Sequence, residues 1–467
     1  MLTGIHLDGG LEAPLYRQLF EQIRQRIALG VLVVGERIPP TRELAEQLGL
    51  NRTTVSAAYE LLEKEGLIRG HVGRGSFVQG APAPAEELKA PGPAAEPRIS
   101  FLASRPPEEL FPGDEFRETV REVMAAGDLG SILQLGSPLG YEPLRRHLLA
   151  QWKQGGEELL VTNGCQQALD LIQRALVSPG DAVAVEDPVY PGLREAFQRG
   201  GARAIGWGNL AELEHVLRRD RPRLIAVTPS FQNPTGRTLS LGERRDVVRL
   251  AAQQQTLLVE VDIYSALRYE GEALPTLKDL AAPDGVVQVG SYSKVAFPGL
   301  RVGWMRGPRA LIARMAEAKR WADLHTDHLA QAILLRFEES GRLEEHRRRV
   351  VTAGRERLAA LLDACAQWFP AEVQYSKPAG GMSVWVRLPE SVDTADLARR
   401  ASREGVGFLP GSYFAVTRSH ANCLRLSFAG TRPEAIREGV QILGGLFRDE
   451  MARPAFSMSA GSAAVVV

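Results

Sequence analysis

Five polar clusters between residues 163 and 301 contain the side chains best suited to chemistry. Each cluster follows a short run of aliphatic or β-branched residues, the pattern of a buried strand. The clusters are Asn163-Gly164-Cys165-Gln166, Asp187-Pro188-Val189-Tyr190, Asn233-Pro234-Thr235-Gly236, Asp262-Ile263-Tyr264, and Ser291-Tyr292-Ser293-Lys294, with Arg301 seven residues beyond the lysine. Alone, Asn233 is explained by a turn, Asp262 by a helix cap and Lys294 by a solvated surface position. Their joint occurrence favours one shared site.

The clusters supply the functional groups that one cofactor requires. A lysine amine forms a Schiff base with an aldehyde, and a carboxylate beside a pyridine nitrogen keeps that ring protonated and electron-accepting. Hydroxyl and amide groups bind a phenolic oxygen, and cationic and hydroxyl groups bind a phosphate. The set therefore indicates pyridoxal 5′-phosphate as the cofactor.

The elements that must position these clusters alternate between strand-like and helix-like patterns from about residue 159. The strand-like runs are ELLVT, DAVAVE, RLIAVT, TLLVEV and GVVQVG, and helical runs such as QQALDLIQRAL and LGERRDVVRLAAQQQ lie between them. Such alternation predicts an α/β fold with a doubly wound, mostly parallel sheet. Ligands of such sheets bind beyond the carboxyl ends of the strands, where the five clusters fall.

The overall composition excludes several classes of protein. The chain has 467 residues, 56 Lys and Arg against 56 Asp and Glu, and three cysteines. A zero net charge argues against a polycation, so any binding of nucleic acid must use a local surface. The cysteines lack paired spacing, so we expect neither a disulfide framework nor a metal site. Neither a signal peptide nor an apolar run of membrane length is present, and we expect a cytoplasmic protein with no membrane partner.

A segment rich in Ala, Pro and Glu divides the chain. Residues 79–99 have no amphipathic period, and we interpret them as a semi-rigid linker between a domain at 1–78 and one at 100–450. A proline-rich surface loop within one domain is the alternative. Residues 451–467 are expected to form a flexible tail.

The first segment has the pattern of a helix-turn-helix. Apolar residues recur every fourth position from Leu15 to Ile27, which predicts a first helix. Thr41 is placed to cap a second helix, TRELAEQL, and Asn51 to cap a third, in which Val55, Ala58, Tyr59 and Leu62 mark the buried face. Two short helices separated by about four residues form this motif, whose second helix enters the major groove of DNA.

The run LIRGHVGRGSFV after the third helix predicts two short strands around a Gly-rich turn, a wing with His71 at its tip. The whole of residues 11–78 closely resembles the winged helix-turn-helix of GntR-type bacterial regulators. The resemblance implies that double-stranded promoter DNA is contacted by Arg42, Arg52, Thr53, Thr54, His71 and Gly73. Residues 1–78 hold eight Arg and Lys64 against nine Asp and Glu, so we expect few phosphate contacts. A helical protein-interaction module is the alternative.

The order and spacing of the five clusters closely resemble those of fold-type I aminotransferases across residues 100–450. The resemblance implies that Lys294 is the Schiff-base lysine, that Asp262 is the pyridine partner, and that Arg425 binds a substrate or effector carboxylate. It further implies that Asn233 and Tyr264 bind the phenolic oxygen and that Tyr190 stacks on the ring. The phosphate would be held by Cys165, Gln166, Ser291, Ser293 and Arg301. For Arg425 the alternative is an arginine at the rim of a strand.

Two positions depart from this family. Leu135 stands where a tyrosine usually reaches the cofactor phosphate of a partner subunit, so that contact is expected to be missing. The segment QWKQGGEELLVT is also shorter than the usual connection and lacks its Arg-Gly pair. Both departures suggest that the domain lacks some of the features that fast catalytic turnover requires.

The two halves together resemble the MocR (GabR-like) regulators, in which a winged helix-turn-helix precedes an aminotransferase-like domain. The resemblance implies a homodimeric transcription regulator that senses pyridoxal phosphate, or an amine effector that exchanges into the Lys294 aldimine. A working aminotransferase, or a cofactor carrier without specific DNA binding, are the alternatives. The effector stays open between the vitamin itself, an amino acid and an ω-amine, and Arg425 mildly favours an amine with a carboxylate.

Overall fold

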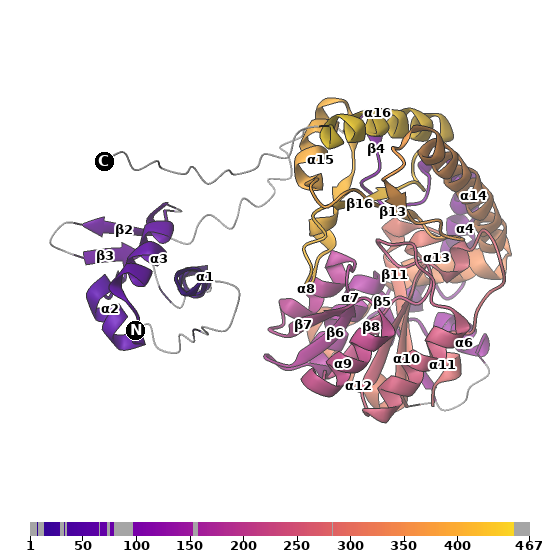
Figure 1. Ribbon diagram of the computed structural model, residues 1–467. Coiled ribbons are helices and arrows are strands. Elements are labelled where there is room, and N and C mark those ends of the chain that lie inside the picture. Colours follow the sequence, from indigo (N-terminus) through magenta and orange to yellow (C-terminus); the bar gives the residue numbers. More distant parts are fainter. Residues whose placement is uncertain are drawn as a thin grey trace, which may run out of the picture. The chain divides into compact units, whose positions relative to one another are not determined.

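The computed structural model describes residues 7, 14–28, 32, 35–64, 66–71, 75–78, 97–152, 157–282 and 284–452. The chain divides into two units, residues 1–96 and 97–467, and each is described by itself (Figure 1). The predicted linker lies outside the described residues except for residues 97–99. Its last residue, Ile99, begins a strand of the second unit.

The first unit is the winged helix-turn-helix that the sequence predicts. Its helices are α1 (Leu15–Ala28), α2 (Thr41–Leu48) and α3 (Arg52–Lys64). Its strands are β1 (Arg37–Ile38), β2 (Ile68–His71) and β3 (Gly75–Val78), in the sheet order β1-β3-β2. The predicted apolar faces form its core, which includes Leu19, Ile23, Val55, Ala58 and Leu62.

Of the two helix caps predicted for this unit, one is confirmed and the other is wrong. Asn51 caps α3, because its Oδ1 accepts a hydrogen bond of 3.1 Å from the backbone nitrogen of Thr53. The prediction for Thr41 is wrong. Pro40, with ψ of 148°, is the last extended residue before α2, so Thr41 falls inside the helix and its hydroxyl makes no cap.

The large lobe of the second unit is built on a seven-stranded sheet of order β5-β11-β10-β9-β8-β6-β7. The strands are β5 (Glu157–Asn163), β6 (Ala182–Glu186), β7 (Arg203–Trp207), β8 (Leu224–Val227), β9 (Leu257–Asp262), β10 (Val286–Ser291) and β11 (Val302–Pro308). All neighbours are parallel except at β11, which is antiparallel to β5 and β10. The mostly parallel sheet is confirmed, and β7 and β11 are strands that the sequence reasoning missed.

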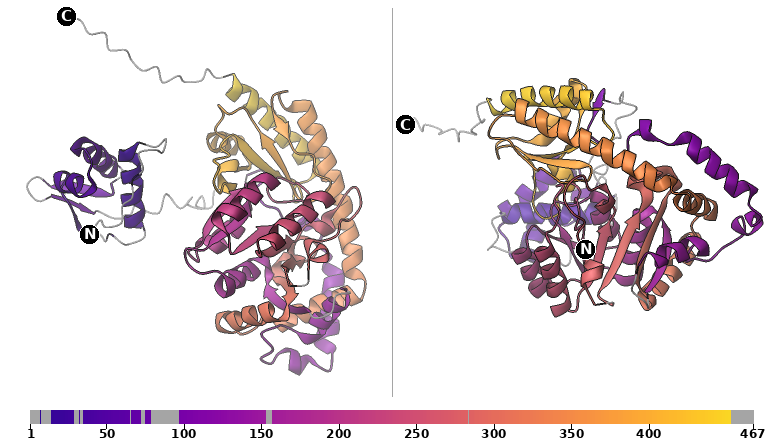
Figure 2. Two further views of the ribbon diagram at one scale, coloured as in Figure 1. Left: turned by 60° about the horizontal axis from the view of Figure 1, so that its bottom comes forward. Right: turned by 90° about the vertical axis from the view of Figure 1, so that its right-hand side faces the viewer.

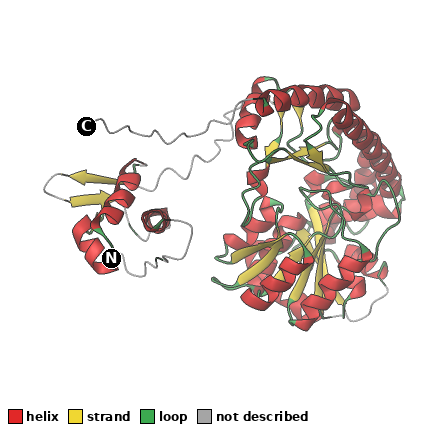
Figure 3. Ribbon diagram, in the orientation of Figure 1, coloured by secondary structure: helices red, strands yellow, loops and turns green. Residues whose placement is uncertain are grey.

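Helices cover both faces of this sheet, as Figure 3 shows. Val183 and Val185 of β6 pack in one core cluster with α7 (Gly164–Leu176), α8 (Pro191–Gln198) and α12 (Arg309–Asp323). Ala184 between them packs in another with α9 (Leu210–Asp220), α10 (Leu241–Gln253) and α11 (Leu277–Leu280). Successive side chains of a strand point to opposite faces, so the two clusters lie on opposite sides of the sheet.

The remaining helices of the large lobe lie around its β5 edge. They are α4 (Gly113–Ala125), α5 (Leu129–Ile132), α6 (Glu142–Ala150) and α13 (His328–Glu339). Leu144 and Leu148 of α6 and Leu334 of α13 pack against Leu159 and Val161 of β5.

The small lobe contains a four-stranded sheet of order β12-β13-β16-β15 and a parallel pair of β4 with β14. Its strands are β4 (Ile99–Ser100), β12 (Gln374–Tyr375), β13 (Ser383–Arg387), β14 (Val406–Gly407), β15 (Leu409–Pro410) and β16 (Cys423–Ser427). Its helices are α14 (Arg342–Trp368), α15 (Thr394–Arg403) and α16 (Pro433–Met451). The long helix α14 joins the lobes, since Leu343 packs beside α13 and Leu361 in the small-lobe core (Figure 2).

Two further searches of the described residues bear on function. No helix among them is long and apolar enough to cross a membrane. No group of three or more His, Cys, Asp and Glu side chains among them is placed to hold a metal ion. Of the predicted tail, only Met451, which ends α16, and Ala452 are described.

Candidate cofactor site

One cavity of about 350 Å³ at the carboxyl ends of the parallel strands collects the predicted side chains. Every residue expected to bind the cofactor or an effector lines it except Asp262. They are Cys165, Gln166, Tyr190, Asn233, Tyr264, Ser291, Ser293, Lys294, Arg301 and Arg425. Asp262 lines a neighbouring cavity, and Ile263 and Ser291 line both. All five clusters therefore contribute residues to one place, and Asp262 lies next to it.

Lys294 follows β10 and points into the cavity, where its amine donates a hydrogen bond to the backbone oxygen of Ser104. Burial lowers the pKa of Lys294 to about 8, and the positive charge of Arg425 acts in the same direction. A lysine of this pKa is roughly one tenth neutral at pH 7, a far larger share than an ordinary lysine has. That neutral form is the nucleophile that attacks an aldehyde.

Asp262 is the last residue of β9, and one of its two carboxylate oxygens accepts no hydrogen bond from the described residues. Its Oδ1 is buried and has no hydrogen-bond partner among the described residues, while Oδ2 accepts from Nε2 of Gln288 at 3.5 Å. Burial raises the pKa of Asp262, and hydrogen bonds from Ser265, followed by the nearby cations Arg244 and Arg306, act in the opposite direction. A buried acceptor without a partner is costly, so this oxygen suits a ligand that brings a proton, as a pyridinium nitrogen does.

Arg425 lies within β16 and is 4% exposed, so it is not at the rim of the strand. Its Nη1 donates to Oδ1 of Asn233 at 3.0 Å, and its Nη2 donates to the backbone oxygen of Leu102. Nε is buried without a partner among the described residues. Burial lowers the pKa of Arg425 to about 10, which leaves it a cation at neutral pH. Its free donor suits a carboxylate.

The tyrosine predicted to bind the phenolic oxygen lies beside this arginine. The amide of Asn233 donates to the hydroxyl of Tyr264 at 3.5 Å. Burial raises the pKa of Tyr264 to about 12, and the charge of Arg425 opposes the shift. Tyr264 is therefore a neutral hydroxyl that is available as a donor.

Another group of residues in the cavity wall has the features of an anion site. Gly164 begins α7 with φ of 74°, and a Cβ there would lie 2.5 Å from Nη2 of Arg301. That same nitrogen donates to the backbone oxygen of Asn163 at 3.3 Å. The hydroxyls of Ser291 and Ser293 are 3.1 Å apart. A helix N-terminus, an arginine and two hydroxyls are the groups that bind phosphate in proteins.

Three other predicted residues have less specific surroundings. Burial raises the pKa of the Cys165 thiol to about 12, so it is neutral. The amide of Gln166 donates to the backbone oxygen of Gly192 at 2.8 Å. Tyr190 lines the cavity and is 44% exposed.

Asp187, which the sequence grouped with Tyr190, does not line the cavity. It accepts hydrogen bonds from Thr417, Arg418 and His420 and so ties the small lobe to the end of β6. Burial lowers the pKa of His420, but the hydrogen bond that His420 donates to Asp187 outweighs burial and raises that pKa to about 9.

Sequence reasoning missed several residues of the cavity wall. Leu102 and Ser104 come from the segment just after β4, and they have no recognisable motif. Tyr413 and Phe414 follow β15, and Phe414 packs 5.0 Å from the guanidinium of Arg425. An aromatic pair directly after a strand end is the only signal that could have found the latter two.

The predicted DNA contacts of the first unit lie on its second and third helices. Arg42 is in the first turn of α2, and Arg52, Thr53 and Thr54 begin α3. The first three are exposed and Thr54 is half-buried. His71 ends β2, but its side chain and the whole of Gly73 lie outside the described residues.

The fold and the cavity together define a fold-type I aminotransferase-like domain behind a winged helix-turn-helix. Residues 110–443 match the family of class I and II aminotransferases, and residues 15–78 match the gntR family of bacterial regulatory proteins. The chain therefore belongs to the class I and II aminotransferase family and begins with a gntR-family domain. This confirms the expected fold class, a winged helix-turn-helix followed by a fold-type I aminotransferase-like domain.

Individual relatives fall into two groups. The 2-aminoadipate transaminase of Thermus thermophilus is 38% identical over 74% of this chain and 89% of its own length. The probable rhizopine catabolism regulatory protein MocR of Rhizobium meliloti is 28% identical, over 94% of this chain and 95% of its own. Among solved structures, the α-aminoadipate aminotransferase LysN from Thermus thermophilus, complexed with N-(5′-phosphopyridoxyl)-L-leucine, has a TM-score of 0.72. It is 37% identical and covers 76% of this chain and 93% of its own.

The family implies pyridoxal 5′-phosphate as the cofactor, and the cavity fits this compound. When bound, it supplies an amine-reactive aldehyde and an electron-accepting ring. Lys294 offers the amine, the unpartnered oxygen of Asp262 suits the ring nitrogen, and the start of α7 with Arg301 suits the phosphate. These are the residues that would hold the cofactor.

Proposed function

We propose that this protein is a DNA-binding transcription regulator whose aminotransferase-like domain senses pyridoxal phosphate, an amine effector, or both. One observation carries the proposal: a gntR-family domain occurs in one chain with a cavity that is lined by side chains suited to pyridoxal phosphate. Relatives with names of transcription regulators align with this chain over nearly its whole length.

The reading of double-stranded promoter DNA is assigned to the start of α3. Arg52 and Thr53 are exposed there, and a guanidinium and hydroxyls are the groups that bond base edges in the major groove. Arg42 on α2 and Thr54 complete the described part of this surface, and His71 and Gly73 are proposed as contacts from the wing. A bacterial transcription regulator must be in the same compartment as the chromosome, so we propose that the protein is cytoplasmic.

The sensing step is assigned to the cavity. We assign amine capture to Lys294, contact with the ring nitrogen to Asp262, and recognition of an effector carboxylate to Arg425. Asn233 and Tyr264 would bind the phenolic oxygen, and Tyr190 would cover the ring. The phosphate would contact Cys165, Gln166, Ser291, Ser293 and Arg301. A ligand shifts DNA binding only if it binds one arrangement of the protein more tightly than another.

A homodimer is the assembly that best explains one exposed apolar surface. Leu135, 81% exposed, and Trp321, 82% exposed, are on neighbouring segments, because Ser137 to Leu139 line one cavity with Glu317 and Arg320 of α12. Leu133 and Leu324 in these segments are also more than half exposed. Large exposed apolar side chains in one region mark a protein interface. A second copy of the chain would cover them.

The test is a fluorescence-anisotropy titration of the full-length protein on its own upstream DNA, at one salt concentration. The protein is measured without cofactor and after loading with pyridoxal phosphate, against a scrambled duplex of equal length. A cofactor-dependent change in affinity or stoichiometry supports the proposal with the cofactor as signal. Specific binding that ignores the cofactor points to a further amine as the signal. The absence of specific binding in both forms would contradict the proposal.

A working aminotransferase is the second candidate, and one observation favours it. Lys294 and the buried Arg425 line the same cavity, as a transaminase requires, and a transaminase is among the relatives at 38% identity. Steady release of keto acid from an amino acid, measured with a coupled assay at catalytic protein concentration, would support it. A single turnover per subunit would favour the regulator.

A further inference from the structure

One loop of the small lobe supplies an aromatic wall to the cavity and is fastened to the large lobe. The loop joins β15 to β16, and its first turn, Gly411–Phe414, places Tyr413 and Phe414 in the cavity wall. The backbone nitrogen of Val189, just after β6, donates to the backbone oxygen of Phe414 at 2.9 Å. Residues 416–420 of the same loop then contact the end of β6 as well.

Asp187, the residue after β6, is the centre of this junction. Its Oδ2 accepts hydrogen bonds from the backbone nitrogens of Thr417 and Arg418, at 2.9 and 3.0 Å, and from the hydroxyl of Thr417 at 2.7 Å. Its Oδ1 accepts from the backbone nitrogen of Val416 at 3.2 Å and lies 2.8 Å from Nε2 of His420. The side chain of Asp187 is 1% exposed. Five donors from one loop therefore surround one buried carboxylate.

The charge of Asp187 decides the role of His420. Burial would raise the pKa of Asp187, but hydrogen bonds from His420, Thr417 and Arg418 outweigh it and hold that pKa well below its usual range. An ionised carboxylate only accepts hydrogen bonds, so Nε2 of His420 is the donor. The backbone of His420 is left-handed, with φ of 47°. Such a conformation is costly for a residue other than glycine and persists only where surrounding contacts impose it, as the bond to Asp187 does.

The His420 ring continues the series of contacts toward Arg425. It packs edge-to-face against Trp385 with ring centroids 6.1 Å apart, and Trp385 packs in the same manner against Phe414 at 5.8 Å. The centroid of the Phe414 ring lies 5.0 Å from Cζ of Arg425. Trp385 is also directly opposite Arg425 in the pairing of β13 with β16, where facing side chains lie on the same side of the sheet. The series from Asp187 to Arg425 is therefore unbroken.

This series bears on the direction of the donors of Arg425. Nη1 and Nη2 are bonded to Asn233 and Leu102, and Nε is buried without a partner among the described residues. A guanidinium is planar, and its five donors lie in that plane. A ring packed against it restricts the orientation of the plane. The position of Phe414 therefore affects where Arg425 can hold a ligand.

We propose that Asp187 and His420 are positioning residues that hold Trp385 and Phe414 against Arg425 and so set the recognition of an effector carboxylate. The inference rests on the assignment of that carboxylate to Arg425 under the proposed function. Neither Asp187 nor His420 lines the cavity, so both act through the two aromatic rings and not by contact with the ligand.

The test compares two ligands that differ only in a carboxylate. They are N-(5′-phosphopyridoxyl)-L-alanine and N-(5′-phosphopyridoxyl)-ethylamine. Each is titrated into cofactor-free, full-length protein, and Kd is read from the fluorescence of the pyridoxyl group.

The main variant is Asp187→Asn, which keeps the size of the side chain. Asparagine has one oxygen in place of two, so its amide nitrogen must face some of the donors of the loop. We expect Kd for the alanine compound to become about twofold to thirtyfold weaker, the range for a substitution that does not touch the ligand. Kd for the ethylamine compound should not change.

A second measurement detects the contact itself. In the wild type, NMR titration should give His420 a pKa of about 9. In Asp187→Asn that pKa should fall to about 6.5 or below, because burial then acts without the opposing carboxylate. General damage to the fold would not produce this change together with a loss confined to one ligand.

The matched control is Asp181→Asn, at the other end of β6. Asp181 accepts a hydrogen bond from the backbone nitrogen of Ser178 at 2.8 Å, and its substitution should alter neither Kd. Should Asp187→Asn fail to fold, His420→Asn leaves the other four hydrogen bonds of Asp187 in place. Asparagine tolerates a left-handed backbone but lacks the ring that packs against Trp385, so this variant should show the same selective loss.

Three results would overturn the inference. They are an unchanged Kd for the alanine compound in Asp187→Asn, an equal loss for both compounds, and an ordinary pKa for His420 in the wild type. A wild-type protein that binds both compounds equally would instead contradict the assignment of the carboxylate to Arg425, and the inference with it.

Discussion

The two functional regions of this molecule are built in different ways. The described residues that we propose to contact DNA are Arg42, Arg52, Thr53 and Thr54, which lie within 41–54 on two consecutive helices, and most of them are exposed. The cavity residues come from segments as distant as Leu102 and Arg425. A surface that must meet a partner can be assembled from one short segment. A site that must desolvate its ligand needs walls from many elements, because only tertiary packing excludes water.

This difference has an electrostatic consequence. Burial in the cavity lowers the pKa of Lys294 to about 8 and raises that of Tyr264 to about 12. Exposed side chains at the start of α3 stay in water, which screens their charges. We therefore expect the cavity to be sensitive to pH near neutrality through a single amine, and substitutions in one region to leave the other intact.

The largest effect is expected for Lys294→Ala. It should abolish the visible absorbance of the bound cofactor, because no other amine lines the cavity among the described residues. Circular dichroism should show an unchanged fold, and cofactor-free protein should keep its affinity for DNA. An unchanged spectrum would show that the site is misassigned. A loss of DNA affinity in the cofactor-free variant would contradict the expectation that the two regions are independent.

The next effect is the pH dependence of cofactor capture. Only the neutral amine of Lys294 attacks an aldehyde, so the rate should rise about tenfold per pH unit below its pKa and level off above about 8. Stopped-flow absorbance on cofactor-free protein measures this. A rate that continues to rise towards about pH 10.4, the value of an ordinary lysine, would show that burial does not perturb this amine.

A smaller effect is expected for Arg52→Ala in the other region. The loss of one base contact typically weakens specific binding by about 1–3 kcal/mol. Anisotropy on promoter DNA measures the loss, and cofactor binding should not change. Arg24→Ala on α1, an exposed arginine paired with Glu21, is the control and should have little effect. Equal affinities of Arg52→Ala and wild type would mean that α3 does not read the bases.

The smallest effect is expected for Asn51→Ala. It removes the cap of α3 and should destabilise the first unit by about 1 kcal/mol, as the loss of a helix cap usually does. Hydrogen exchange of the α3 amides in the full-length protein measures this local loss of stability. Asn163→Ala should show no such loss in α7, because Asn163 caps nothing there. Equal effects at both sites would contradict that distinction.

Much of the fold could be predicted because it follows from local patterns. Helical periodicity identified α1, α2 and α3, and the alternation of strands and helices identified β5, β6, β8, β9 and β10. The strand β11 was missed because it is antiparallel and lies between β5 and β10, outside the simple alternation. The cap at Thr41 was wrong because the backbone of Pro40, not the capping preference of threonine, sets the start of α2.

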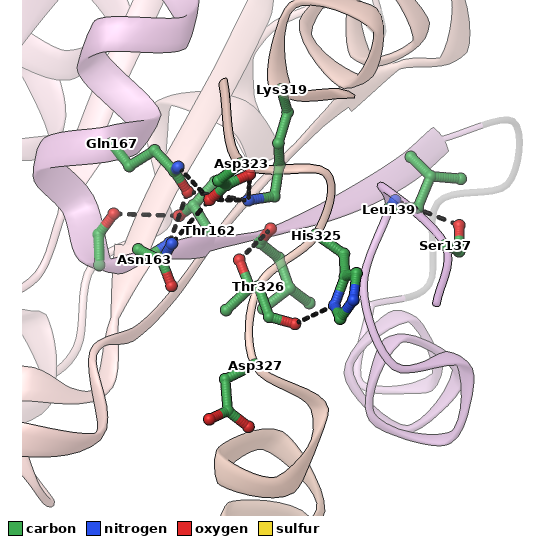
Figure 4. Close-up of polar contacts among 12 residues, drawn as sticks. Ser137, Leu139, Thr162, Asn163, Gln167, Lys319, Asp323, His325, Thr326 and Asp327 are labelled. Carbon is green, nitrogen blue, oxygen red and sulfur yellow. Dashed lines mark hydrogen bonds and ion pairs between the residues drawn. The ribbon is translucent and has the colours of Figure 1, made fainter. Parts of the chain in front are cut away.

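The sequence by itself determined the kinds of groups that the protein uses: an amine at Lys294, a carboxylate at Asp262, a guanidinium at Arg425, and a reader helix that begins at Arg52. Their types and their places after strands follow from local composition and periodicity. Only the tertiary structure decided that Ser104 accepts from Lys294, that Arg425 is buried, and that Asp323 accepts a hydrogen bond from Asn163 (Figure 4). Each of these depends on residues more than one hundred positions apart, whose approach is set by packing and hydrogen bonding that no local pattern records.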